Sequence, residues 1–171
     1  LFTLLAVALR RPAFAPEQVE RLRGQLLTHL ARRDQHTGSV AGLAFDKLLY
    51  PDHPYGIADD GYPDTVRAIT RDEIAAFHRQ TYGPRGLTLV IVGGIPAAAA
   101  VELAERHLGD WDNPQQPPEP ELPALVAPEN VREKRTSLPG KSQSDLIWGT
   151  IGPRRADPDY LSALLGNHIL G

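Results

Sequence analysis

Histidine is the residue type in this chain best suited to bind a metal or to transfer a proton near neutral pH. The sequence has no cysteine, which excludes disulfides and cysteine-type zinc sites. Its six histidines are His29, His36, His53, His78, His107 and His168. None of them belongs to a His-x-x-Glu-His sequence, the spacing that projects two zinc ligands and a carboxylate from one helix. The sequence therefore predicts no catalytic residue and no assembled metal site in this chain.

Two other clusters could carry function. Residues His53-Pro-Tyr-Gly56 could form a functional loop, because loops often carry binding and catalytic residues. We favour a structural turn there, with Tyr55 packed beneath it. The basic cluster of Arg132, Lys134 and Arg135 is interpreted as the solvated side of an edge strand. Such an edge could also pair with an extended peptide, so peptide binding at this cluster stays a hypothesis.

The composition describes a globular protein of one domain or parts of two. The chain has 171 residues, of which 42% are hydrophobic and 23% are charged. A net charge of −3 provides no basic field for a phosphate backbone, so nucleic acid is not a predicted partner. The absence of cysteine is compatible with a reducing or an oxidising compartment, so it does not indicate a localisation.

The apolar run at residues 1–9 is too short to span a bilayer, and the sequence predicts no membrane span. Arg10 and Arg11 follow this run, whereas a signal peptide would carry its basic residues first. We therefore interpret residues 1–9 as the end of a buried helix, with Leu1 inside that helix rather than at a natural start.

Apolar residues three and four positions apart, together with capping signals, predict a largely helical first part. The second helix begins after Pro16, and its apolar stripe contains Val19, Leu22, Leu26 and Leu30. A third follows Thr37-Gly38-Ser39, and Thr70-Arg-Asp-Glu73 is a capping box for a helix to about Thr81. Further helices are expected at residues 97–108 and from Asp157-Pro158 onward.

Three segments are predicted as strands, which makes the expected fold class α+β. Residues 87–92 are short, β-branched and almost entirely apolar, as in a strand that is covered on both faces. Residues 131–138 and 144–151 flank the turn at Pro139-Gly140. Between the two parts, residues 112–128 hold six prolines and indicate an extended connector. The expected architecture has antiparallel or mixed sheets that are covered by helices.

Four segments together resemble the pitrilysin/insulinase-type zinc metallopeptidase family, in particular its mitochondrial-processing-peptidase-like branch. They are Arg11-Pro-Ala-Phe14, the run from Leu49 to Gly56, Tyr82-Gly-Pro84 with the following Leu89 to Gly94, and Asp157-Pro-Asp-Tyr160 with Asn167 to Gly171. The resemblance implies two similar α+β domains joined by a linker. Residues 1–111 would be the later part of a first peptidase-like domain, residues 112–130 the Pro-rich linker, and residues 131–171 the start of a second domain.

The resemblance also implies where a metal would bind. In this family two histidines and a distal glutamate hold zinc, and a second glutamate is the general base. Matching the family pattern to the second helix places the distal ligand at His29 and a supporting glutamate at Leu22. Thr28 and Leu30 are not carboxylates either. His29 is therefore only a minor metal candidate, and we expect no cofactor in this chain, with zinc confined to the family's catalytic members.

The main functional hypothesis from the resemblance is a non-catalytic domain or subunit of a zinc metalloendopeptidase. It would support peptide binding and the closed chamber of an active partner. The expected partners are a catalytic peptidase half or subunit and, in the full assembly, a peptide substrate. One alternative is a truncated catalytic zinc metallopeptidase whose His-x-x-Glu-His motif lies upstream of Leu1. Another is a core-protein-like assembly subunit without a peptidase role. No substrate-binding residue can be named from the sequence.

Overall fold

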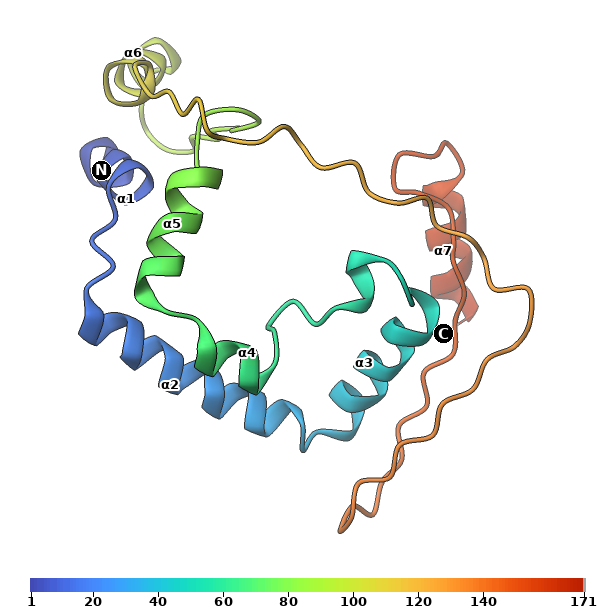
Figure 1. The fold of residues 1–171 in the computed structure, drawn as a ribbon. Coiled ribbons are helices and arrows are strands. Elements are labelled where there is room, and N and C mark those ends of the chain that lie inside the picture. Colours follow the sequence, from blue (N-terminus) through green and yellow to red (C-terminus); the bar gives the residue numbers. More distant parts are fainter. Residues whose placement is uncertain (171) are drawn as a thin grey trace. The chain divides into compact units, whose positions relative to one another are not determined.

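The computed structural model describes residues 1–170 (Figure 1). Their helices, in chain order, are α1 (Phe2–Arg10), α2 (Pro16–Arg33), α3 (Thr37–Leu49), the 3-10 turn η1 (Pro54–Gly56), α4 (Pro63–Ala68), α5 (Arg71–Thr81), α6 (Ala97–Leu108) and α7 (Tyr160–Leu170). They form two compact units. The first contains Leu1–His29 and Tyr62–Glu121, and the second contains Leu30–Gly61 and the described residues from Leu122 onward. Among residues 1–170, no helix has both the length and the apolarity needed to cross a bilayer.

Most helix predictions are confirmed. Helix α2 begins at Pro16, a favoured first helical residue, and Arg32 and Arg33 lie in its last turn, as expected for its negative end. Helices α1, α5 and α6 lie within about a residue of their predicted bounds, and α3 begins at Thr37, before its predicted start after Ser39. Helix α4 was not predicted, although Pro63 at its start is a recognisable signal. Helix α7 begins at Tyr160 rather than directly after Asp157 as predicted. The Asp157 carboxylate accepts a hydrogen bond from the Arg154 N–H at 2.7 Å.

The predicted α+β fold class is wrong for the described residues, because they contain helices and no strand. A strand exists only where a neighbouring strand supplies ladder hydrogen bonds, and residues 87–92, 131–138 and 144–151 have no such neighbour here. Val90 and Val92 are 77% and 93% exposed, so this apolar segment is not covered on both faces as predicted. Apolarity and β-branching describe a chain that is compatible with a sheet, but they do not supply the pairing partner.

The first unit is held together by contacts between segments distant in sequence. Arg10 on α1 donates a hydrogen bond to the carbonyl of His107 on α6 at 3.2 Å and forms an ion pair with Asp110 at 2.6 Å. This guanidinium holds the pKa of the Asp110 carboxyl below its usual range. Ala6 on α1 and Ala100 on α6 are buried, and such small residues allow two helices to approach closely.

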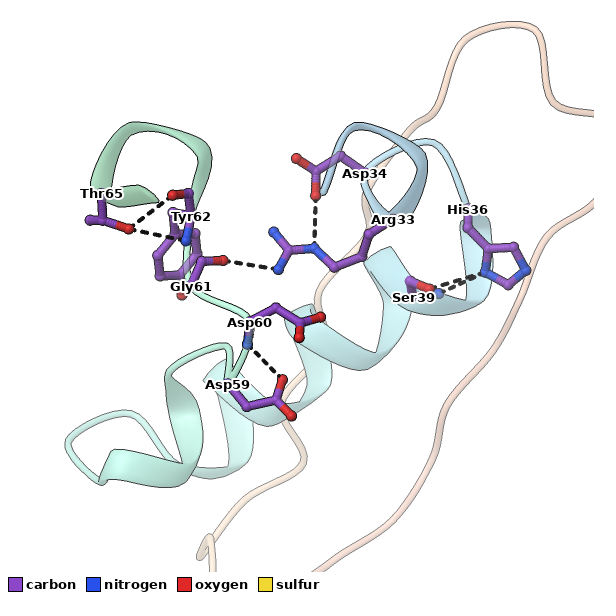
Figure 2. A network of polar contacts seen from close by, with 9 residues as sticks. All are labelled: Arg33, Asp34, His36, Ser39, Asp59, Asp60, Gly61, Tyr62 and Thr65. Atoms are coloured by element: carbon purple, nitrogen blue, oxygen red, sulfur yellow. Dashed lines mark hydrogen bonds and ion pairs between the residues drawn. The ribbon is translucent and has the colours of Figure 1, made fainter. Parts of the chain in front are cut away.

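The second unit contains the most deeply buried side chain, Leu30, in the last turn of α2. The next apolar element, α3, packs against η1. Arg33 lies beside them with its side chain only 9% exposed, and its guanidinium contacts the Asp34 carboxylate at 3.1 Å and the Gly61 carbonyl at 2.9 Å (Figure 2). The last turn of α2 is thus fixed by one buried leucine and one hydrogen-bonded arginine.

The capping box at the start of α5 is confirmed. The Thr70 hydroxyl accepts a hydrogen bond from the Glu73 N–H at 3.2 Å, and the Thr70 N–H donates to the Glu73 carboxylate at 2.7 Å. The Thr70 hydroxyl also donates to this carboxylate at 2.7 Å, and the two hydrogen bonds donated by Thr70 hold the pKa of the Glu73 carboxyl below its ordinary value of 4.5.

We expect Thr70→Ala to lower the free energy of unfolding by about 1 kcal/mol, the typical cost of losing an N-cap side chain. Thr70→Ser keeps the hydroxyl and should restore most of the loss. Because the pKa of Glu73 is lower in the folded state, its contribution is present above the unfolded pKa and is lost as the pH falls through the folded pKa. Urea denaturation at pH 7 and at pH 3 measures both effects. A cost of Thr70→Ala that is as large at pH 3 as at pH 7 would contradict the Glu73 contribution.

Candidate functional site

The face of α2 that carries Leu22 and His29 is the place where the family resemblance puts a distal metal ligand. Both side chains are exposed, and they lie seven residues apart on one helix. The positions one turn from His29 are occupied by Gln25, Leu26, Arg32 and Arg33. None of these four positions of α2 offers a carboxylate oxygen as a ligand, and two of them carry cationic side chains.

This donor set does not fit a zinc ion, which is bound by neutral imidazole, thiolate or carboxylate ligands in groups of three or four. Within residues 1–170, no group of three or more histidine and acidic side chains is arranged to hold a metal. His29 has its own interaction within the protein. The prediction that this chain holds no metal rests on the chemistry of these residues and stays a prediction.

We expect His29→Ala to leave the zinc content of the full-length protein unchanged, because no position of α2 within one turn of His29 carries a carboxylate with which to share a metal. His168→Ala is the matched control, since His168 is also an exposed histidine on a helix. Elemental analysis of the purified variants gives the zinc-to-protein ratio. The loss of one zinc equivalent in His29→Ala alone would make His29 a ligand.

The other histidines lie in separate places. His36, His78 and His107 have structural roles, as does His53 in the next loop. The Nδ1 atom of His36 accepts a hydrogen bond from the Ser39 N–H at 3.2 Å and caps α3 (Figure 2). The His78 ring contacts the Leu9 carbonyl through Nε2 at 2.8 Å. His107 stacks on Phe2 with a ring separation of 6.3 Å. One of these roles has a signal in the sequence, because His36 lies directly before Thr37-Gly38-Ser39, where α3 begins.

The segment from His53 to Gly56 is a turn, and His53 is the cap at its start. His53 is 8% exposed, and its Nδ1 accepts a hydrogen bond from the Tyr55 N–H at 3.1 Å. Its ring lies 4.6 Å from that of Tyr55 and 5.9 Å from that of Tyr50. Tyr55 is 55% exposed, so the prediction that it packs beneath the turn is wrong, and His53 is the buried residue. An imidazole caps a short turn well because it combines a flat apolar ring with a nitrogen acceptor.

The basic cluster of Arg132, Lys134 and Arg135 lies in an extended segment without strand pairing. Arg132 donates a hydrogen bond to the Leu48 carbonyl at 3.3 Å, and Arg135 pairs with Glu133 at 2.5 Å. The hypothesis of peptide addition to an edge strand therefore loses its basis, because the described residues contain no strand at this position.

An open cleft of about 630 Å³ lies between α1 and α6, with Val7, Arg10, Arg106, Asp110 and Trp111 among its lining residues. Arg10 is paired with Asp110, and Arg106 is paired with Glu102 on its own helix. The arginines are thus partly neutralised by nearby carboxylates. A general acid or nucleophile needs an activating neighbour. Of the titratable groups that line this cleft, His107 stacks on Phe2 and Asp110 is paired with Arg10.

The strongest side-chain pair on α2 is structural. Arg23 contacts both carboxylate oxygens of Glu20, at 3.0 and 3.1 Å, and also the carbonyl of Val66 on α4. The hydrogen bond lowers the pKa of the Glu20 carboxyl and raises the pKa of the Arg23 guanidinium. A carboxylate with a lowered pKa is a poor general base, so this pair holds α2 to α4 rather than activating water.

Comparison with known proteins gives relatives along the whole chain. A family model described as Peptidase M16 inactive domain matches residues 68–171. An uncharacterized zinc protease of Mycobacterium leprae is 30% identical over 155 residues, which are 89% of this chain and 30% of the relative. A probable mitochondrial-processing peptidase subunit beta of Schizosaccharomyces pombe is 22% identical, over 98% of this chain and 37% of its own length.

The fold also matches a solved structure. A crystal structure of a peptidase M16 inactive domain from Pseudomonas fluorescens superposes with a TM-score of 0.75 and 24% sequence identity, over 99% of this chain and 40% of that one. The chain thus spans between 30% and 40% of the length of these proteins. The family model covers more than half of the chain and agrees with the motifs found in the sequence. The chain belongs to the peptidase M16 inactive-domain family.

Proposed function

We propose that this chain is a non-catalytic part of a zinc metalloendopeptidase of the pitrilysin/insulinase type. In this role it supports peptide binding and closes the chamber of an active half or subunit, which supplies the zinc-activated water. Within the chain we propose the division suggested by the resemblance, with residues 1–111 in one domain, residues 112–130 as the linker and residues 131–171 in the next domain.

The observation that carries this proposal is the chemistry of α2. His29 occupies the position that is matched to the distal zinc ligand, and Leu22 occupies the position of the expected supporting glutamate. The residues on either side of His29 in the sequence, Thr28 and Leu30, are not carboxylates. The histidines with defined contacts act as caps or ring-stacking partners rather than as a metal cluster. The match of residues 68–171 to a domain described as inactive is consistent with the same conclusion.

The proposal is tested with the full-length protein, alone and mixed with a separately purified protein that carries His-x-x-Glu-His. We expect less than stoichiometric zinc and no peptide hydrolysis from the protein alone. Hydrolysis in the mixture should exceed that of the His-x-x-Glu-His protein by itself. The control replaces the glutamate of the partner's motif by glutamine, which removes the general base and should abolish activity in the mixture.

Two outcomes contradict the proposal. The first is stoichiometric zinc together with hydrolysis by the protein alone, provided that its sequence carries no second, active half. The second is a mixture that is no more active than the partner alone, which would favour an assembly role without peptidase function.

A further inference from the structure

The connector carries a regular pattern of prolines. Pro117, Pro120 and Pro123 are spaced three residues apart, so that two Pro-x-x-Pro sequences overlap. A polyproline II helix has three residues per turn, and residues at this spacing lie along one edge of it. Pro118 lies outside this spacing and therefore off that edge.

The sequence restricts almost every residue of this segment to the polyproline II region. Each proline fixes its own φ near −65°, and each residue that precedes a proline is pushed away from the helical region. In residues 117–123, only Glu121 is neither a proline nor followed by one. The segment therefore loses little conformational entropy when a partner binds it.

The structure leaves this segment accessible and fixes its beginning. All seven side chains from 117 to 123 are exposed, and among the described residues none makes a backbone hydrogen bond in this stretch. Directly before it, the Gln116 side chain accepts a hydrogen bond from the Arg85 N–H and donates one to the Arg85 carbonyl, both at 3.0 Å. The Asn113 amide donates to the carbonyls of Arg79 and Tyr82, at 2.9 and 2.6 Å.

Gly83 permits this attachment. A Cβ at Gly83 would overlap the Gln116 side-chain oxygen and lie 2.9 Å from the Asn113 Cβ. The amides of Asn113 and Gln116 thus hold one end of the proline segment on the turn that follows α5, while the side chains of the segment itself are exposed.

We propose that residues 117–123 are a polyproline II ligand for a partner domain with an aromatic-lined groove and a rim of lysine or arginine. Aromatic grooves bind polyproline II segments because the ligand is already ordered and its proline rings pack between flat side chains. The basic rim follows from charge. Residues 112–130 contain Asp112, Glu119, Glu121 and Glu129 and no lysine or arginine. This inference does not depend on the peptidase role, because the pattern and its exposure are properties of the connector alone.

The competing interpretation is a stiff spacer, since proline-rich segments also act as semi-rigid connectors. A spacer needs prolines but no particular edge. A ligand needs the edge of Pro117, Pro120 and Pro123. Substituting a proline on this edge and a proline off it therefore distinguishes the ligand from the spacer.

The test uses the full-length protein and a panel of purified WW domains whose grooves carry basic residues, with affinities measured by isothermal titration calorimetry. We expect saturable binding by at least one of these domains. Pro120→Ala should weaken it about tenfold or more, as for an anchor residue at an interface. Pro118→Ala, the control off the edge, should change the affinity by less than about threefold. Glu119→Lys should weaken binding and reduce its dependence on salt concentration.

Circular dichroism and thermal denaturation confirm that each variant is folded, which is expected because the substituted side chains are exposed. The proposal is overturned if no domain of the panel binds, or if Pro118→Ala costs as much affinity as Pro120→Ala. Either result would leave the segment as a spacer.

Discussion

Leu30→Ala should lower the free energy of unfolding by about 3 kcal/mol, within the usual range for a leucine that is removed from a packed site. Leu30 is fully buried, and its loss would remove apolar contacts and leave a cavity. The same substitution at Leu22 is the matched control. Leu22 belongs to the same helix and to the same predicted apolar stripe, but its side chain is 55% exposed. We expect Leu22→Ala to cost less than about 1 kcal/mol.

Urea denaturation followed by far-UV circular dichroism measures this difference, with the slope of the transition as a check that the unfolded state is unchanged. The comparison is informative because the residue type, the helix and the substitution are the same at both positions. Equal costs at Leu22 and Leu30 would show that the second unit does not enclose Leu30 as described.

Gly56→Ala should destabilise the protein by about 1–3 kcal/mol, the usual cost of forcing an extra methyl group into a filled site. A Cβ at Gly56 would overlap the carbonyl oxygen of Tyr50 and lie 3.2 Å from its carbonyl carbon. The same Tyr50 carbonyl accepts a hydrogen bond from the His53 N–H at 3.4 Å. Backbone atoms cannot rotate away as the end of a side chain can, so the turn itself must shift.

Gly24→Ala is the control, and its effect should have the opposite sign. Gly24 lies in the middle of α2, where no atom outside its own helix backbone and chain neighbours lies within 4 Å of an added Cβ. Alanine should stabilise the helix there by about 0.5–1 kcal/mol, because glycine loses more backbone entropy on folding. Thermal denaturation of the two variants should therefore show midpoints on opposite sides of the wild-type value. A lowered midpoint for Gly24→Ala, or an unchanged one for Gly56→Ala, contradicts these contacts.

The helices could be predicted from the sequence because their signals are local. Proline at the first position of α2, the Thr70–Glu73 capping box, and apolar residues at spacings of three and four all act within one or two turns. The family resemblance was also readable, since it depends on short motifs in a fixed order, and the match of residues 68–171 agrees with it.

The strand predictions failed because strand formation does not depend on local signals alone. Residues 87–92 have the composition of a buried strand, but strand formation requires a paired neighbour, which is a property of the tertiary structure. The stripe of α2 shows a similar limit. Its period was correct, but the period alone could not show that Leu30 is enclosed while Leu22 is largely exposed.

The sequence by itself determined the positions of most helices, the membership in the family, and the absence of carboxylates at Leu22 and His29, because each follows from residue type and short-range spacing. Only the tertiary structure decided that His53 is buried, that Arg10 joins α1 to the end of α6, and that the predicted strands lack partners. Burial and pairing depend on which distant segments meet, and the spacing of residues along the chain does not specify those encounters.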